Sequence, residues 1–205
     1  MTKKQGSADH HPPLVIKLGG SLISHVPDLV PVICRSNRPI IIVPGGSIFA
    51  DTVRRTAVND TSAHWMAVAA MDQYGWYIAS HGMEITHTLK APQKPVIFLP
   101  YCVLHKRDPL PHLWSVTSDS VAAWIADALS LDLLILKSAD GIMKNNVMLS
   151  SVKAPVETET VDPFLIPFVI EKKVRTTVIN GSCVHRVEKF LSGEKVLGTT
   201  IGTTF

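Results

Sequence analysis

A single lysine followed by two glycines and a serine stands near the start of the chain. The segment 15–21 is an apolar run that contains Lys17 and then opens onto Gly19, Gly20 and Ser21. An apolar run bounded by glycines predicts a buried strand that delivers its last residues to a loop. Glycines let backbone N–H groups approach an anion, and the lysine adds a full positive charge. The pattern predicts a phosphate site, although a buried strand with a glycine turn of no chemical use has the same sequence.

A second glycine loop follows the next apolar run, 40–43. It leads into a predicted helix, and a loop that opens a helix N-terminus makes another pocket that favours anions. Two such pockets suggest a donor and an acceptor, whereas the simpler interpretation is that the glycines only let helix and strand pack closely. If the acceptor already carries a phosphate, an arginine here can clamp it through two parallel hydrogen bonds. The candidate acceptor-binding residues are Gly45, Gly46, Ser47, Asp51 and Arg54.

Carboxylates and a second lysine follow further along the chain. Asp119 lies in the first turn of a helix predicted over 119–129, where an acidic residue is favoured by the helix dipole alone. A carboxylate near the phosphate-binding lysine would instead hold that ammonium in position. The apolar run 133–137 ends in Lys137 and enters a loop with Ser138, Asp140 and Gly141. This loop is a third candidate for chemistry at the end of a strand.

The elements that must position these residues alternate between apolar strand-like runs and helix-like stretches. This alternation is typical of a mostly parallel sheet covered on both faces, so we predict an α/β fold, a three-layer αβα sandwich with a central open sheet. Ligands of such sheets bind beyond the carboxyl ends of the strands, where the candidate residues lie. The predicted strands are 14–18, 39–43, 84–89, 96–99, 133–137, 175–179 and 197–201, and Asn145–Asn146 predicts a hairpin turn.

Helix signals fill the intervals between the predicted strands. Ser62 and Ser118 are candidate N-caps, Asp162–Pro163 offers a cap and a first-turn proline, and Gly82 and Gly193 are candidate stops. The predicted helices run from the Ser62 cap to about residue 80, over 119–129, from 163 to about 173, and over 183–191. We expect one domain over 13–205, preceded by a flexible tail over 1–12.

Composition and charge exclude several classes of function. Hydrophobic residues make up 46% of the 205 residues and charged residues 18%, as in a globular protein, and no apolar run is long enough to cross a bilayer. The net charge of +3 comes from scattered lysines and arginines, which gives no support to nucleic-acid binding. Three distant cysteines suit free thiols in a reducing cytosol, and no ligand spacing predicts a metal site. The first dozen residues lack the apolar core of a signal peptide, so we expect a cytoplasmic protein.

Taken together, the motifs resemble the amino acid kinase superfamily, which includes carbamate, acetylglutamate, aspartate, uridylate and isopentenyl phosphate kinases. The resemblance rests on Lys-x-Gly-Gly-Ser after the first strand, Val-x-Gly-Gly after the second, Ser-Asp-Ser-x-Ala-Ala-x-Ile-Ala before a central strand, and Asp-Gly-Ile after it. The segments 178–181 and 198–201 are similar to the closing strands of that superfamily. The short length and the segment 63–75 look most like a small archaeal branch that phosphorylates an aminomethyl-furan methyl phosphate in methanofuran biosynthesis.

The resemblance implies an ATP-dependent kinase that uses Mg²⁺ and transfers the γ-phosphoryl group to a small phosphorylated acceptor, giving a diphosphate. It implies that Lys17 contacts the transferring group, with the amides of Gly19 and Gly20 beside it, and that Asp119 orients Lys17. It implies a homo-oligomer, a dimer or larger, for which the apolar helix after Ser62 is the expected surface. The nucleotide would be bordered by Gly19, Gly20, Ser21, Lys137, Ser138, Asp140, Gly141 and Lys172.

One feature departs from the superfamily pattern. Many members carry a second catalytic lysine in a longer glycine-rich segment before the penultimate strand, and the segment 144–174 is short and lacks it. Lys172 or Lys173 can reach the nucleotide from a helix end, or Lys137 can substitute, whereas a solvated helix C-terminus explains Lys172 and Lys173 equally well. The alternatives are a kinase of a carboxylate, a nucleoside monophosphate or isopentenyl phosphate, and a non-catalytic binder of nucleotides or oxyanions.

Overall fold

A computed structural model, which describes residues 11–202, has a central sheet of eight strands. The strand order is β3-β4-β2-β1-β5-β9-β10-β8, and every neighbouring pair is parallel except β9 and β10. The predicted open and mostly parallel sheet is therefore confirmed. Its strands are β1 (Leu14–Leu18), β2 (Ile40–Pro44), β3 (Ile85–Thr86), β4 (Val96–Phe98), β5 (Asp132–Lys137), β8 (Ser151–Val152), β9 (Thr176–Asn180) and β10 (Thr199–Ile201).

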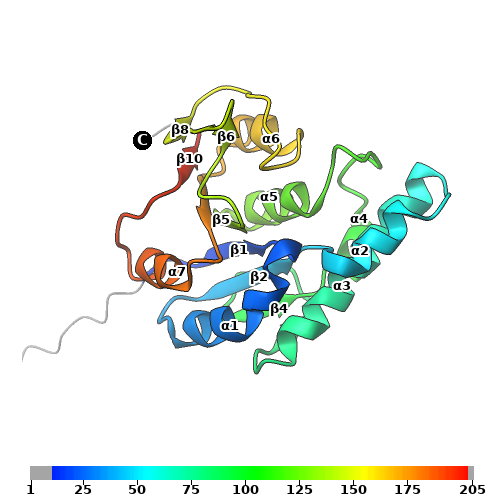
Figure 1. Ribbon diagram of the computed structural model, residues 1–205. Coiled ribbons are helices and arrows are strands. Elements are labelled where there is room, and N and C mark those ends of the chain that lie inside the picture. Colours follow the sequence, from blue (N-terminus) through cyan, green and yellow to red (C-terminus); the bar gives the residue numbers. More distant parts are fainter. Residues whose placement is uncertain (1–10, 203–205) are drawn as a thin grey trace, which may run out of the picture.

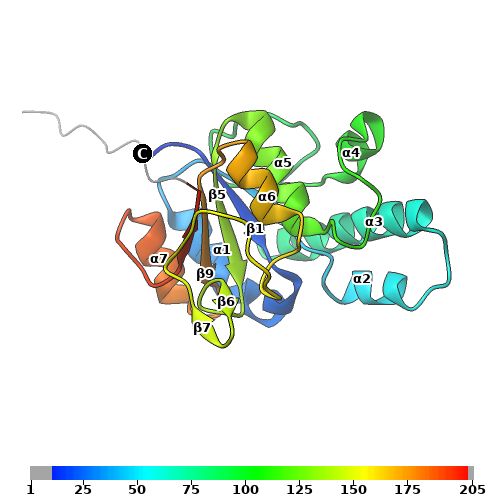
Figure 2. The same ribbon diagram turned by 90° about the horizontal axis from the view of Figure 1, so that it is seen from above.

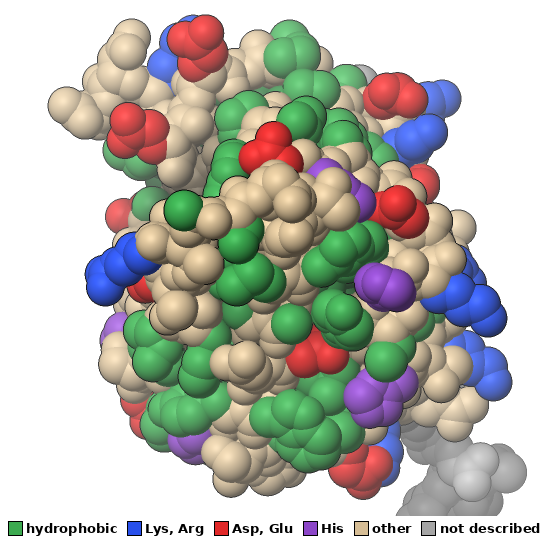
Figure 3. Space-filling view, turned by 90° about the vertical axis from the view of Figure 1, so that its right-hand side faces the viewer, with side chains coloured by type: hydrophobic (Ala, Val, Ile, Leu, Met, Phe, Trp, Pro, Cys, Tyr) green, Lys and Arg blue, Asp and Glu red, His purple; other side chains and the backbone are tan. Residues whose placement is uncertain are grey.

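Helices cover both faces of the sheet and form the predicted three layers (Figures 1 and 2). The helices α1 (Val26–Arg35) and α7 (Val184–Leu191) pack on one face, and α5 (Ser118–Leu129) and α6 (Leu165–Glu171) pack on the other. The helices α2 (Ser47–Arg54), α3 (Asp60–Ala79) and α4 (Tyr101–Arg107) lie toward the edge that carries β4. Figure 3 shows this side, where hydrophobic side chains are spread over the surface with histidines among them.

The two faces of β1 and β5 bury different cores because side chains alternate along a strand. Leu14, Ile16 and Leu18 point to the α1 and α7 side, whereas Val15 points to the α5 side. This alternation places Lys17 on the α5 side. In β5, Leu133 and Ile135 also face α5, so Lys137 lies on that face too. The sheet therefore brings two lysines from adjacent strands to the same layer.

Some elements begin or run differently from the prediction. The α3 helix begins at Asp60, because Asn59 rather than Ser62 is its N-cap and accepts a hydrogen bond from the Ser62 amide at 2.9 Å. The α5 helix begins at Ser118, with Thr117 as its cap. No helix was predicted for α1, α4 or the 3₁₀ turn η1 (Gly20–His25), and no strand for β8. Pro31 inside α1 explains one of these omissions, since proline disfavours a helix interior.

The hairpin predicted at Asn145–Asn146 is present between β6 (Met143–Lys144) and β7 (Val147–Met148). Both asparagines have positive φ, 50° and 60°, as a two-residue hairpin turn requires. The expected tail falls mainly on residues 1–10, outside the described range, and the carbonyl of Pro12 already accepts a hydrogen bond from Arg38 Nε at 2.6 Å. Within 11–202, no helix combines the length and apolar character needed to cross a membrane.

Candidate active site

The two glycine loops touch each other at the carboxyl ends of β1 and β2. The Gly45 amide donates to the Leu18 carbonyl at 2.9 Å, and the Ser47 hydroxyl donates to the Gly20 carbonyl at 3.1 Å. A Cβ on Gly20 would lie 2.5 Å from the backbone nitrogen of Ser47, so only glycine permits this approach. The amide of Gly19 donates to the Leu136 carbonyl and is therefore not available to an anion. Gly19 still lines the cavity with Lys17 and Gly20, and contact of the two glycines with a phosphate stays a prediction.

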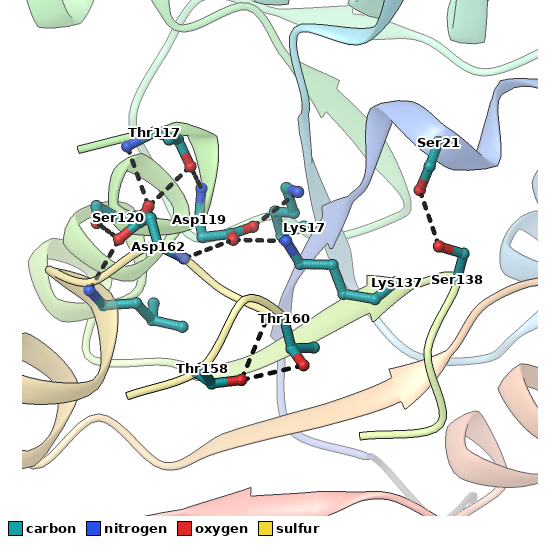
Figure 4. Close-up of polar contacts among 11 residues, drawn as sticks. Lys17, Ser21, Thr117, Asp119, Ser120, Lys137, Ser138, Thr158, Thr160 and Asp162 are labelled. Carbon is teal, nitrogen blue, oxygen red and sulfur yellow. Dashed lines mark hydrogen bonds and ion pairs between the residues drawn. The ribbon is translucent and has the colours of Figure 1, made fainter. Parts of the chain in front are cut away.

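A carboxylate from α5 bridges the two lysines that the sheet brings together (Figure 4). Lys17 Nζ lies 2.7 Å from Asp119 Oδ1, and Lys137 Nζ lies 2.6 Å from Asp119 Oδ2. In the strand register Lys17 is opposite Ile135, so Lys137 is its diagonal neighbour on the same face, within reach of one carboxylate. The side chains of Lys17 and Asp119 are 5% and 2% exposed, whereas that of Lys137 is 20% exposed. Lys137 is thus the more accessible of the two ammonium groups.

The electrostatics of this cluster follow from two cations sharing one anion. Burial would raise the pKa of Asp119, but the charges of Lys17 and Lys137 outweigh it and hold that pKa below its ordinary value. Burial lowers the pKa of Lys17, and the nearby Lys137 charge acts in the same direction, against the attraction of Asp119. With both lysines protonated, the cluster carries one net positive charge. That excess charge favours binding of an anion.

Asp162 locks the N-terminus of α5 to the N-terminus of α6. Its carboxylate accepts five hydrogen bonds, from the amide and hydroxyl of Thr117, the amide and hydroxyl of Ser120, and the amide of Leu165. The amide of Asp162 lies 3.4 Å from Asp119 Oδ2, within hydrogen-bonding distance. The α6 helix begins at Leu165 with Phe164 as its N-cap, so the prediction that Asp162 caps it is wrong, although the Asp162 carboxylate accepts a hydrogen bond from the Leu165 amide at 2.9 Å.

The site opens into a cavity of about 770 Å³. The first turns of η1, α2 and α5 all lie in its wall, and the first amides of a helix have no acceptor within the helix. The side chains of Lys17, Lys137 and Asp119 reach it as well. Helix N-termini and ammonium groups all favour negative charge, so this part of the cavity suits a phosphate. Residues 158–163, which precede α6, form another part of the cavity wall, and Asp162 joins this segment to the start of α5.

The structure brings most of the candidate residues to this cavity. Lys17, Gly19, Gly20, Ser21, Gly46, Ser47, Asp51, Arg54, Asp119 and Lys137 all line it. Ser138 does not line the cavity, but its hydroxyl is 3.5 Å from the hydroxyl of Ser21, which does. Gly45 packs against the backbone of the first glycine loop.

Three candidates lie elsewhere. Lys172 is at the end of α6 away from the cavity wall and is 3.5 Å from the carboxylate of Glu171, so it does not line this cavity and its contact with the nucleotide stays a prediction. Asp140 accepts hydrogen bonds from Arg186 at 2.6 Å and Asn180 at 3.2 Å, and the arginine in particular lowers the pKa of Asp140. Gly141 packs against the hydroxyl of Thr199. Asp140 and Gly141 therefore shape the loop after β5 and do not line the cavity.

Toward the edge of the sheet the cavity wall is formed by α2 and the first turns of α3. Asp51 and Arg54 pair at 2.6 Å on α2, where both side chains are more than half exposed, and His64 on α3 lines the same region. Asp72, another possible partner for an amine, instead accepts a hydrogen bond from the Tyr101 amide, and burial raises its pKa. Trp65 on α3 is partly buried against the core beside His105.

Several residues of the site were not singled out for function. Thr117, Ser120 and the wall segment 158–163 gave only loop and cap signals in the sequence. Leu113 and Trp114 lie in a segment without periodicity. Tyr74 was assigned only to a helix, yet its hydroxyl lies 3.4 Å from the Gly19 carbonyl. The sequence signal for Asp162 was its position before Pro163, and its role as a lock depends on contacts more than 40 residues apart in the chain.

Comparison with known proteins adds relatives of the same size. No protein-family model matches the chain. The [5-(aminomethyl)furan-3-yl]methyl phosphate kinase of Methanocaldococcus jannaschii is 27% identical over 211 residues, which cover 91% of this chain and 96% of that protein.

Solved structures with the same architecture are also similar over nearly their whole length. UMP kinase from Ureaplasma parvum has a TM-score of 0.72 at 15% identity and covers 95% of this chain and 100% of that structure. Uridylate kinase from Archaeoglobus fulgidus has a TM-score of 0.69 at 17% identity, with 92% and 99% covered, and an isopentenyl phosphate kinase has 0.62 at 14%, with 92% and 100% covered. The chain thus has the fold of the amino acid kinase superfamily, and the resemblance that its motifs carry is confirmed.

Proposed function

We propose that this protein is an ATP-dependent kinase that transfers the γ-phosphoryl group to a small phosphorylated acceptor and produces a diphosphate and ADP. The observation that carries the proposal is the carboxylate of Asp119, which holds Lys17 and Lys137 at the wall of a cavity formed by two touching glycine loops. The similarity to the M. jannaschii enzyme over 91% of the chain supports [5-(aminomethyl)furan-3-yl]methyl phosphate as the acceptor.

The charge of the cluster matches what phosphoryl transfer demands of a protein. Negative charge is spread over the oxygens of the transferred group in the transition state, and catalysis consists mainly of positioning and electrostatic stabilisation. Lys17 and Lys137 supply two ammonium groups on the same face of the sheet, and the first turns of η1, α2 and α5 add backbone dipoles. Asp119 is enclosed by the two lysines, so we assign it a positioning role.

The arrangement favours an acceptor that is already anionic. Because the second pKa of a phosphate monoester is about 6, its oxygens are largely ionised at neutral pH and can attack without a general base. Asp119 is a poor base, since the two lysines lower its pKa. In the proposed reaction an acceptor oxygen forms a bond to the γ-phosphorus while the bond from that phosphorus to the bridging oxygen of ATP breaks, and ADP leaves. Carboxylates, nucleoside monophosphates and isopentenyl phosphate meet the same requirement and remain alternatives.

Lys137 takes the place that the sequence analysis left open for a second lysine. Lys137 ends β5, its ammonium is 2.6 Å from Asp119, and it lines the cavity. Lys172 neither contacts Asp119 nor lines the cavity. A second cation beside Lys17 removes the main support for a non-catalytic binder. We infer that Lys137 contacts phosphate oxygens of the nucleotide.

We propose that Mg²⁺ enters with ATP, where it would help to neutralise the phosphates. Within residues 11–202, no group of three or more His, Cys, Asp or Glu side chains can hold a metal ion. The two buried carboxylates of the cavity are already engaged, Asp119 by two lysines and Asp162 by five hydrogen bonds. The side chains therefore form no dedicated cage, and phosphate oxygens and water would be the main ligands of the ion.

The test is ADP release from Mg·ATP in the presence of different acceptors. The panel contains [5-(aminomethyl)furan-3-yl]methyl phosphate, isopentenyl phosphate, UMP and N-acetylglutamate, with no acceptor as the blank. Among these acceptors, we expect fast ADP release only with the furan phosphate. Mass spectrometry is expected to show a diphosphate product. Binding of ATP without acceptor-dependent ADP release in any mixture would overturn the proposal. Homo-oligomer formation and a cytoplasmic location stay predictions, and light scattering in solution tests the first.

A further inference from the structure

Apolar side chains are unusually exposed at the cavity. Eight large hydrophobic side chains are exposed within residues 11–202, and three of them, Ile48, Leu113 and Trp114, line this one cavity. Their exposed fractions are 60%, 53% and 53%. Single exposed hydrophobic residues are common on protein surfaces, but several around one concave site mark a place where an apolar ligand is bound.

Leu113 and Trp114 lie on a connection between α4 and α5 that is fixed at both ends. Before them, His112 contacts the Thr61 hydroxyl at 3.1 Å and the Asp108 carboxylate at 2.8 Å. After them, Thr117 donates two hydrogen bonds to Asp162, at 3.0 and 2.8 Å. A short segment held at two points presents its side chains in a defined place, so the exposed pair is a preformed surface of the cavity.

This surface is close to the phosphate-binding cluster. Trp114 precedes Thr117 by three residues, so their Cα atoms are at most about 11 Å apart. Thr117 is the N-cap of the helix whose first turn carries Asp119. Leu113, Trp114 and the lysine pair line the same cavity. A small molecule can therefore place its phosphate on the lysines and its apolar part against Trp114.

We propose that Leu113 and Trp114 form the platform on which the ring of the acceptor stacks, and that they select a flat, monocyclic aromatic or heteroaromatic phosphate over an aliphatic one. The inference rests on the proposed kinase function. An aromatic ring stacks on the indole face with a favourable electrostatic contribution beyond the area that it buries, which an aliphatic chain lacks. The phosphate end is bound by charge and the ring end by this platform. The platform residues touch the acceptor only, so they determine specificity and take no part in the transfer itself.

The experiment compares matched variants with two acceptors, [5-(aminomethyl)furan-3-yl]methyl phosphate and isopentenyl phosphate. Trp114→Leu removes the aromatic face and keeps an apolar side chain, whereas Trp114→Phe keeps a ring. Leu113→Ala is matched by Leu197→Ala, because Leu197 is 52% exposed and does not line the cavity. We expect Trp114→Leu to raise the KM for the furan phosphate about 10-fold, with kcat within about 2-fold and Trp114→Phe close to the parent.

A binding measurement without ATP separates this inference from the kinase proposal. Titration of the furan phosphate alone is expected to change the intrinsic tryptophan fluorescence of the parent protein, and Trp114→Phe is expected to lose most of that change. An unchanged KM in Trp114→Leu, an equal loss for both acceptors, or a lower kcat at constant KM would overturn the platform. Failure of every acceptor to release ADP would overturn the kinase function instead, while the fluorescence titration would still test the platform.

Discussion

The most demanding test of the site is the replacement Asp119→Asn, which keeps the shape of the side chain and removes its charge. Two ammonium groups lie 2.6 and 2.7 Å from this carboxylate, and the side chain of Lys17 is only 5% exposed. Removing one partner of a buried ion pair typically costs about 3–5 kcal/mol, because the remaining charge is uncompensated. Burial already lowers the pKa of Lys17, so the variant can relieve part of this cost by releasing the proton of Lys17. We therefore expect a loss of about 3–5 kcal/mol in the free energy of unfolding.

The activity of Asp119→Asn is expected to fall by about 10²–10³-fold in kcat, which is typical when a preorganised electrostatic group is lost. Urea denaturation and ADP release measure the two effects on the same preparation. Asp119→Glu, which keeps the charge, serves as the control and is expected to lose less stability. A variant with parent-like turnover would refute the idea that Asp119 positions the two lysines.

The same pair of proteins gives a pH dependence with a defined sign. Because the folded-state pKa of Asp119 is lowered, its contribution to stability is fully present above its ordinary pKa of about 4 and is lost as the pH falls through the lower folded value. The stability gap between the parent and Asp119→Asn is therefore expected to be wide at pH 6 and to narrow progressively as the pH falls below about 4. A gap that stays constant over this range would contradict the pairing.

The remaining predictions concern the frame around the cluster. Gly20→Ala is expected to destabilise the fold by about 1–3 kcal/mol and to lower activity, because the added Cβ would meet the Ser47 backbone. Gly82→Ala, where a Cβ has open space but φ is 102°, is the control for backbone strain alone. Equal losses of activity in the two variants would contradict the contact between the loops. Asp162→Ala leaves the amide and hydroxyl of Thr117 and of Ser120 without their acceptor. The free energy of unfolding, measured by thermal or urea denaturation, is therefore expected to fall by about 3 kcal/mol, together with a lower kcat. An unchanged denaturation midpoint would show that Asp162 does not hold α5 in place.

The sequence allowed much of the frame to be predicted, because buried parallel strands are continuous apolar runs. β1 matched its predicted bounds, and the turn at Asn145–Asn146 followed from residues that tolerate positive φ. The α1 helix was not predicted, since Pro31 in its interior disfavours helix while tertiary packing of Leu29 and Ile33 stabilises it.

The candidate site was predictable where a motif carries the residue at a strand end, as for Lys17 and Lys137. The pairing of both lysines with one carboxylate depends on strand register and on where α5 crosses the sheet, and neither is visible in local sequence. The hydrogen bond from the Gly19 amide to the Leu136 carbonyl was equally invisible, because its acceptor lies in β5, more than 100 residues later in the chain. Trp114 was missed because a non-periodic connection gives no signal until the fold places it beside a cavity.

The central claim is that Lys17, held by Asp119, acts on the transferred phosphoryl group. Steady-state ADP release with Mg·ATP and [5-(aminomethyl)furan-3-yl]methyl phosphate, compared between the parent and Lys17→Met, tests it most directly. Asp119 keeps Lys137 as a partner in this variant, so the fold is expected to persist, as circular dichroism can verify. We predict a fall in kcat of about 10²-fold or more with a folded protein. Turnover within a few-fold of the parent would contradict the account.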